Sequence, residues 1–189
     1  MRAPPPVRLV PFRPDLLDAV VPWFDHPEVQ HRLGGRSWPA RELRLRAAPH
    51  SEEFRGRWVV RTHSYVVLDE ADTPVAQIGG DVYDRWTSWD PATERVTATY
   101  PGTAMGSAYV VDPARWGRGY GRAALLALLR HPELADVAQF VLGVEPDNTA
   151  SLRAAAAAGF QPLTTAPDAE DMVYLRLARS SAADGTVPA

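Results

Sequence analysis

The sequence predicts an α/β protein built on a mixed sheet that is antiparallel in its N-terminal half. Two β-rich runs, residues 64–68 and 75–83, are joined by the polar turn Asp-Glu-Ala-Asp-Thr-Pro, which predicts an antiparallel pair of strands. Farther along the chain, a strand over 106–111, a helix over 122–130 and a strand over 140–144 alternate. This alternation is typical of two parallel strands joined by a crossover helix.

Local patterns predict the remaining elements. In chain order they are a strand over 7–12, a helical region over 14–23 that continues through 27–33, a helix over 41–48, an irregular insertion over 84–103, an alanine-rich helix that ends at Gly159, and a last strand over 172–177. Residues 1–178 are expected to form a single domain. The small, polar residues 179–189 are expected to form a flexible tail.

Composition limits the classes of function. The chain has no cysteine, which excludes disulfides, a thiolate nucleophile and a cysteine-based metal site, and no metal site is predicted. Its net charge of −3 argues against general nucleic-acid binding. Residues 1–6 lack the apolar core of a signal peptide, and no run approaches the roughly 20 apolar residues that cross a membrane. We therefore expect a cytoplasmic protein with no membrane partner.

The most informative segment is a glycine-rich turn between the strand over 106–111 and the helix that follows it. Glycines at three alternate positions, 117, 119 and 121, let the backbone approach a ligand closely, and arginines add positive charge. A turn that opens directly into a helix points unpaired N–H groups and the positive end of the helix dipole at one spot, which suits a diphosphate. The spacing fits neither a Walker loop nor the dinucleotide-binding fingerprint. Residues 117–122 are called the diphosphate cradle below.

A second signature follows the strand over 140–144, where the chain reads Glu-Pro-Asp-Asn-Thr-Ala-Ser. Asn148 or Thr149 is placed to cap the helix that follows, and Gly159 supplies the left-handed residue that ends it. The two signatures resemble those of the GNAT superfamily of acyl-coenzyme A N-acyltransferases, namely Gln/Arg-x-x-Gly-x-Gly/Ala and Asn-x-x-Ser…Gly-Phe. Gly119 and Gly121 match the first motif, whereas Trp116 stands where Gln or Arg is usual. The resemblance covers residues 105–161.

The resemblance implies a GNAT-like mixed sheet with helices on both faces and two parallel strands that splay apart around the cofactor. It also implies acetyl-coenzyme A as the acyl donor, with residues 107–111 beside the pantetheine arm. The cofactor-binding residues implied are Ala108, Tyr109, Val110, Val111, Trp116, Gly117, Arg118, Gly119, Tyr120, Gly121, Arg122, Asn148 and Ser151. The layout near the N-terminus resembles the branch of aminoglycoside N-acetyltransferases and siderophore-type lysine acyltransferases.

The catalytic residues cannot be assigned from the superfamily's usual positions. A neutral amine must attack the thioester directly, with no covalent enzyme intermediate, so a base has to remove a proton. The superfamily's usual tyrosine acid falls at Ala155, and the branch's Asp or His falls at Ala108. Asp81, Tyr83 and Asp84, at the end of the strand over 75–83, are therefore the candidate catalytic residues. With the acidic insertion they predict a cationic amine bound between the insertion and residues 23–33.

Three functions remain open at this point. An N-acetyltransferase for a primary amine of a small molecule is favoured. An acetyltransferase for proteins or peptides and a non-catalytic coenzyme A-binding protein are the alternatives, because the fold alone does not choose the acceptor. The sequence is compatible with a monomer or a homodimer.

Overall fold

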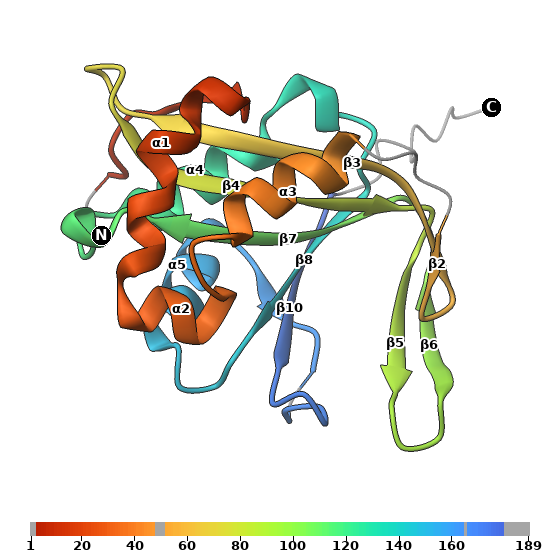
Figure 1. Ribbon diagram of the computed structural model, residues 1–189. Coiled ribbons are helices and arrows are strands. Elements are labelled where there is room, and N and C mark those ends of the chain that lie inside the picture. The colour runs from red at the N-terminus through yellow and green to blue at the C-terminus, as the bar shows by residue number, and fades with distance from the viewer. Residues whose placement is uncertain (1–2, 48–51, 165, 180–189) are drawn as a thin grey trace.

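The structure is a computed structural model that describes residues 3–47, 52–164 and 166–179. Its main sheet has the strand order β1-β3-β4-β7-β8-β10-β9, and the short β2 (Glu53–Phe54) pairs with β3. The first half of this sheet is antiparallel, as predicted (Figure 1). It consists of β1 (Arg8–Pro11), β3 (Arg57–Leu68), β4 (Pro74–Tyr83) and β7 (Ala104–Val111).

The predicted parallel pair is confirmed, and it is short. β7 pairs in parallel with β8 (Gln139–Val144) only from Ala104↔Gln139 to Ser107↔Leu142. Beyond that last pair the two strands separate, although both continue, and we call this point the fork. β10 (Val173–Ala178) and β9 (Gln161–Pro162) complete the sheet beyond β8 in antiparallel pairing. The expected splayed pair is therefore present.

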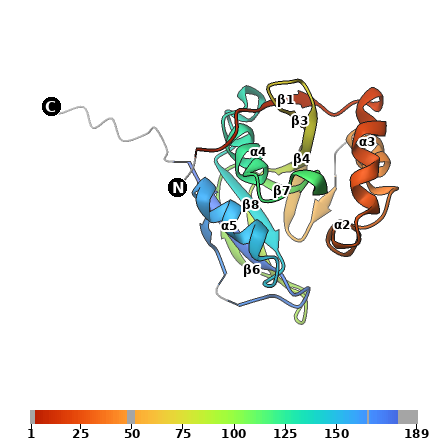
Figure 2. The same cartoon turned by 90° about the vertical axis from the view of Figure 1, so that its left-hand side faces the viewer.

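Helices cover both faces of the sheet (Figure 2). The crossover helix α4 (Tyr120–Leu129) and α5 (Thr149–Ala158) lie on one face, where Leu125 and Leu128 pack in a cluster with Ile78, Met105 and Phe140. A second cluster lies on the opposite face, under the N-terminal helices. Those helices are η1 (Pro14–Leu16), α1 (Leu17–Val20), η2 (Val21–Asp25), α2 (Pro27–Leu33) and α3 (Trp38–Ala47).

The prediction of an irregular insertion over 84–103 was wrong. These residues form a hairpin of β5 (Trp86–Asp90) and β6 (Arg95–Tyr100), a two-stranded sheet that projects from the main one (Figure 1). The carboxylate of Asp90 accepts hydrogen bonds from the Ala92 N–H and the Thr93 hydroxyl, which closes the turn between the strands. An acidic residue in this segment therefore shapes the backbone.

Other boundaries differ by smaller amounts. β3 begins at Arg57, well before the predicted residue 64, and α3 begins at Trp38, before the predicted 41, while Ala48 lies outside the described residues. At the C-terminus, the Arg179 guanidinium donates to the carbonyls of Leu129, Leu134 and Ala135. Of the tail predicted over 179–189, Arg179 is thus anchored to the domain, and residues 180–189 lie outside the described residues. Within the part of the chain that is described, no helix is long and apolar enough to cross a membrane.

Candidate active site at the fork of the sheet

The diphosphate cradle has the geometry that its glycines predict. Gly117 and Gly119 adopt φ values of 72° and 86°, in the left-handed region that favours glycine, and Gly119 is the N-cap of α4. The first N–H groups of a helix have no intrahelical acceptor, so those at the start of α4 are available to an anion. Arg118 is exposed beside them, whereas Arg115 pairs with Asp69 at 3.1 Å.

Gly121 has a packing role as well. A Cβ atom there would lie 3.2 Å from Cε2 of Tyr109 and 3.6 Å from Cβ of Ala154. The glycine thus lets α4 pack closely against both β7 and α5. Its neighbour Tyr109 is partly buried, and this burial raises the pKa of its phenol, while its hydroxyl lies 2.9 Å from the Ser151 hydroxyl.

The second signature folds as predicted. The Asn148 side chain caps α5 by accepting the Ser151 N–H at 3.1 Å, and Gly159 ends the helix with a φ of 101°. The structure thus brings four of the predicted cofactor residues, Tyr109, Gly121, Asn148 and Ser151, together around the fork. Their polar groups also hold one another in place.

Trp116, the departure from the superfamily motif, is fixed by two contacts. Its indole N–H donates to the Val111 carbonyl at 2.9 Å, and its ring lies edge-on to the His26 ring at 4.5 Å between centroids. Trp116 is 43% exposed. The tryptophan therefore connects the end of β7 to the N-terminal helices beside the cradle.

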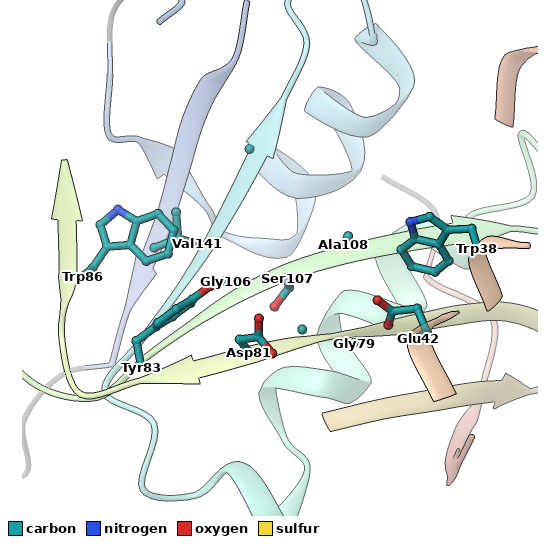
Figure 3. Close-up of a pocket in the computed structure, with 12 residues that line it drawn as sticks. Trp38, Glu42, Gly79, Asp81, Tyr83, Trp86, Gly106, Ser107, Ala108 and Val141 are labelled. Carbon is teal, nitrogen blue, oxygen red and sulfur yellow. The ribbon is translucent and has the colours of Figure 1, made fainter. Parts of the chain in front are cut away.

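A cavity of about 260 Å³ lies at the fork (Figure 3). We call it the fork cavity. It is bounded by α3, β4, β7, β8 and the base of the β5–β6 hairpin. Its lining residues are Trp38, Glu42, Gly79, Gly80, Asp81, Tyr83, Trp86, Gly106, Ser107, Ala108, Val141 and Gly143.

Glycines allow the close approach of strands and rings that shapes this cavity. A Cβ atom on Gly80 would lie 1.8 Å from the Gly106 carbonyl oxygen, so no side chain fits there without movement of β7. A Cβ atom on Gly106 would lie 3.1 Å from the Trp86 ring and 3.3 Å from the Tyr83 ring. The two rings therefore pack directly on the backbone of β7 and form one wall of the cavity.

A buried cation supports that wall from behind. The Arg57 side chain is 6% exposed, and its guanidinium lies 3.8 Å from the centroid of a Trp86 ring and 4.6 Å from that of Tyr83. It also donates to the Thr87 carbonyl at 3.0 Å. Burial lowers the pKa of Arg57, but an arginine stays protonated at any physiological pH. The stacking compensates part of the cost of burying the charge.

Two carboxylates give the cavity its charge. Figure 3 shows Glu42 extending from α3 toward the strand that carries Asp81. Burial raises the pKa of Glu42, and the negative charge of Asp81 raises it further. Burial is also the main cause that raises the pKa of Tyr83, followed by the charge of Asp81. Asp81 accepts a hydrogen bond from the Thr62 hydroxyl, which fixes its orientation.

The structure separates the three predicted catalytic residues. Asp81 and Tyr83 line the fork cavity, as expected from their alternate positions on β4. Asp84 does not, because its carboxylate accepts the Trp58 N–H at 2.9 Å and pairs with Arg85 at 2.6 Å. Residues 23–33 do not line the cavity either; α3 takes that place.

Trp38 and Glu42 were missed by sequence reasoning. They lie one turn apart on α3, so they share one face of the helix. Their spacing of four is a usable signal only if the helix is known to begin at Trp38, and the predicted helix began at residue 41. Nothing local in the sequence indicates that this face lies against β4.

A sheet that forks beside a glycine-rich turn at a helix start is the arrangement expected of an acyl-coenzyme A-dependent acyltransferase. Residues 7–161 match the family described as acetyltransferase (GNAT) domain. The chain is also 35% identical over 155 residues to an uncharacterized N-acetyltransferase, YfmK, of Bacillus subtilis (strain 168), across 82% of this chain and 85% of that protein. The chain therefore belongs to the GNAT family of acetyltransferases.

Other relatives match over a shorter stretch. The mycothiol acetyltransferase of Amycolatopsis mediterranei (strain U-32) is 39% identical over 74 residues, which are 38% of this chain and 25% of that protein. That of Nocardioides sp. (strain ATCC BAA-499 / JS614) is 38% identical over 93 residues, 48% of this chain and 30% of the relative. The chain thus aligns with less than a third of each of these longer proteins.

Solved structures agree on the fold. Aminoglycoside acetyltransferase AAC(6')-Ib in complex with coenzyme A superposes with a TM-score of 0.64 at 18% identity, covering 92% of this chain and 95% of that one. A putative phosphinothricin N-acetyltransferase gives a TM-score of 0.60 at 18% identity, over 93% and 99% of the two chains. The expected resemblance to aminoglycoside N-acetyltransferases is confirmed at the level of the fold.

Proposed function

We propose that this enzyme transfers the acetyl group of acetyl-coenzyme A to a primary amine of a small cationic molecule. The observation that carries the proposal is the lining of the fork cavity. Two carboxylates, Glu42 and Asp81, lie beside the aromatic rings of Trp38, Tyr83 and Trp86. Carboxylates attract an ammonium group, and aromatic faces add cation–π attraction, so the cavity suits a cation.

In this proposal the donor lies along the other side of the fork. The diphosphate would sit against the cradle, on the N–H groups at the start of α4 and near Arg118 and Arg122. The pantetheine arm would run beside residues 108–111 of β7, the part of the strand that has left β8 and can offer its backbone groups on that side. Trp116, Tyr120, Asn148 and Ser151 would border this path.

The reaction needs a base because an alkyl ammonium group has a pKa near 10.4. Its deprotonation at pH 7 costs about 5 kcal/mol, at roughly 1.4 kcal/mol for each pKa unit. We assign this role to Asp81, which can accept the proton directly or through a water molecule. Glu42 would hold the positive charge of the acceptor until the proton leaves. The free amine then attacks the thioester carbonyl in a ternary complex, without a covalent enzyme intermediate.

Two comparisons support a small-molecule acceptor. Relatives bear the name mycothiol acetyltransferase, and a structural neighbour is an aminoglycoside acetyltransferase. Neither name is transferred to this chain, because the first match covers a quarter of the relative and the second is 18% identical. A cytoplasmic location and a homodimer belong to the same proposal, and the molar mass in solution tests the dimer.

Release of coenzyme A, measured with alkyl amines, aminoglycosides and short peptides, tests the acceptor class. Turnover of small cationic amines with little turnover of peptides is expected. Turnover of peptides alone would instead assign a peptide or protein acetyltransferase. If no acceptor were used and acetyl-coenzyme A still raised the melting temperature, the protein would be a non-catalytic coenzyme A-binding member of the family.

A further inference from the structure

Ser107 occupies the branch point of the sheet and carries a hydroxyl that the fold does not use. It forms the last pair between β7 and β8, opposite Leu142, and it lines the fork cavity. Its Oγ atom is buried and has no hydrogen-bond partner among residues 3–47, 52–164 and 166–179. Buried polar atoms in folded proteins nearly always have a partner, so an exception of this kind calls for an explanation, of which a catalytic role is one.

The direction of the side chain separates Ser107 from the carboxylates. Side chains alternate along a strand, so Ser107 shares its face of β7 with Met105 and Tyr109, which both pack in the cluster under α4 and α5. On β4, Ile78 and Val82 belong to that same cluster, which places Asp81 on the opposite face, toward α3. The fork cavity therefore has the carboxylates on one face of the sheet and the serine on the other.

The face that Ser107 shares is the face of the cofactor cradle. α4, whose N-terminus forms the cradle, packs there, and so does α5. The superfamily's usual tyrosine acid would come from α5, but that position is Ala155, which is fully buried. Tyr83 does not replace it, because it lies on the same face of β4 as Asp81.

We infer that the Ser107 hydroxyl donates a hydrogen bond to the coenzyme A sulfur as the thiolate leaves. This inference rests on the proposed function. Asp81 first takes the ammonium proton and passes it on to water, and as the C–N bond forms it takes the second proton from nitrogen; the C–S bond then breaks, and its electron pair stays on sulfur. Ser107 keeps its own proton and stabilises the thiolate, which has an ordinary thiol pKa near 8.5 and takes a proton from water afterwards.

Ser107→Ala is the direct test. Loss of a hydrogen bond to a charged leaving group should lower kcat about 10- to 100-fold with little change in the KM of either substrate. Ser107→Cys replaces the hydroxyl by a thiol, which is a weaker donor, so its kcat should lie between those of the wild type and Ser107→Ala. Ser88→Ala, which removes a hydroxyl on β5 outside the fork cavity, is the matched control and should keep the wild-type kcat.

A second readout does not depend on turnover. The pKa of the coenzyme A thiol in the binary complex, followed by thiolate absorbance against pH, should be higher in Ser107→Ala than in the wild type. Equal kcat and equal thiol pKa in the two proteins would overturn the inference. Failure of the wild type to turn over any amine would instead contradict the proposed function, and the thiol titration would still decide the role of Ser107.

Discussion

The hydroxyls of Tyr109 on β7 and Ser151 on α5 lie 2.9 Å apart and connect the two sides of the fork. β7 and β8 no longer pair at this height, so the side-chain hydrogen bond helps to hold α5 against the open strand. Asn148 fixes Ser151 from the other direction through the helix cap. The opening of the sheet is thus held in shape by a tyrosine of β7 together with two residues of the second signature.

Tyr109→Phe should lower the free energy of unfolding by about 1 kcal/mol, because it removes one hydrogen bond and leaves the Ser151 hydroxyl unpaired. The melting temperature should fall by roughly 2 to 4 °C for a chain of this size. Thermal melting monitored by circular dichroism measures this. Tyr100→Phe is the control, since its ring contact with Arg176 remains; an equal loss there would show that the effect is not specific to the fork.

Gly121→Ala should weaken binding of acetyl-coenzyme A. The new Cβ atom would lie 3.2 Å from the Tyr109 ring, so either the ring or the first turn of α4 must move, and both border the proposed cofactor path. We expect the dissociation constant, measured by calorimetry, to rise at least several-fold. Gly35→Ala is the matched control, because a Cβ atom there meets nothing within 4 Å. Unchanged affinity in Gly121→Ala would place the cofactor elsewhere.

Much of this architecture is predictable because it depends on local signals. The Asn148 cap, the left-handed Gly159 and the alternation of strand and helix around the cradle each need only a few consecutive residues. The β5–β6 hairpin was missed because Asp90 and Pro91 indicate a break, while the pairing of Trp86 with Tyr100 across the hairpin is visible only in three dimensions. Glu42 was missed because its position opposite β4 is likewise visible only in three dimensions.

Asp81→Asn should lower kcat with a small amine by about 10² to 10⁴, the usual contribution of a positioned base. Asp84→Asn tests the other predicted carboxylate, which the Trp58 N–H and Arg85 engage outside the fork cavity. Asp18→Asn, on the exposed surface of α1, is the control for a lost surface charge. Loss of activity in Asp84→Asn alone would move the base to Asp84. Full activity in the double variant of Asp81 and Asp84 would exclude both residues.

Glu42→Gln should change how stability depends on pH. Burial and the charge of Asp81 raise the pKa of Glu42 above its ordinary value of 4.5, so the folded chain binds this proton more tightly than the unfolded chain does. Below pH 4.5 the Glu42 carboxyl is protonated in both the folded and the unfolded state, so it does not lower the free energy of unfolding. As the pH rises from 4.5 through the raised pKa of the folded state, the wild type loses stability that the neutral amide does not lose.

The melting temperature of Glu42→Gln minus that of the wild type should therefore grow with pH over this window and stay constant above it. Melting curves of both proteins from about pH 4 to pH 8 measure the difference. Glu70→Gln, in an exposed turn, is the control and should follow the wild type throughout. A difference that shrinks as the pH rises would mean that Glu42 gains a favourable partner in the folded state, and the acidic character assigned to the fork cavity would be wrong.

The KM for a cationic amine should also rise in Glu42→Gln, because the charge that holds the acceptor is lost.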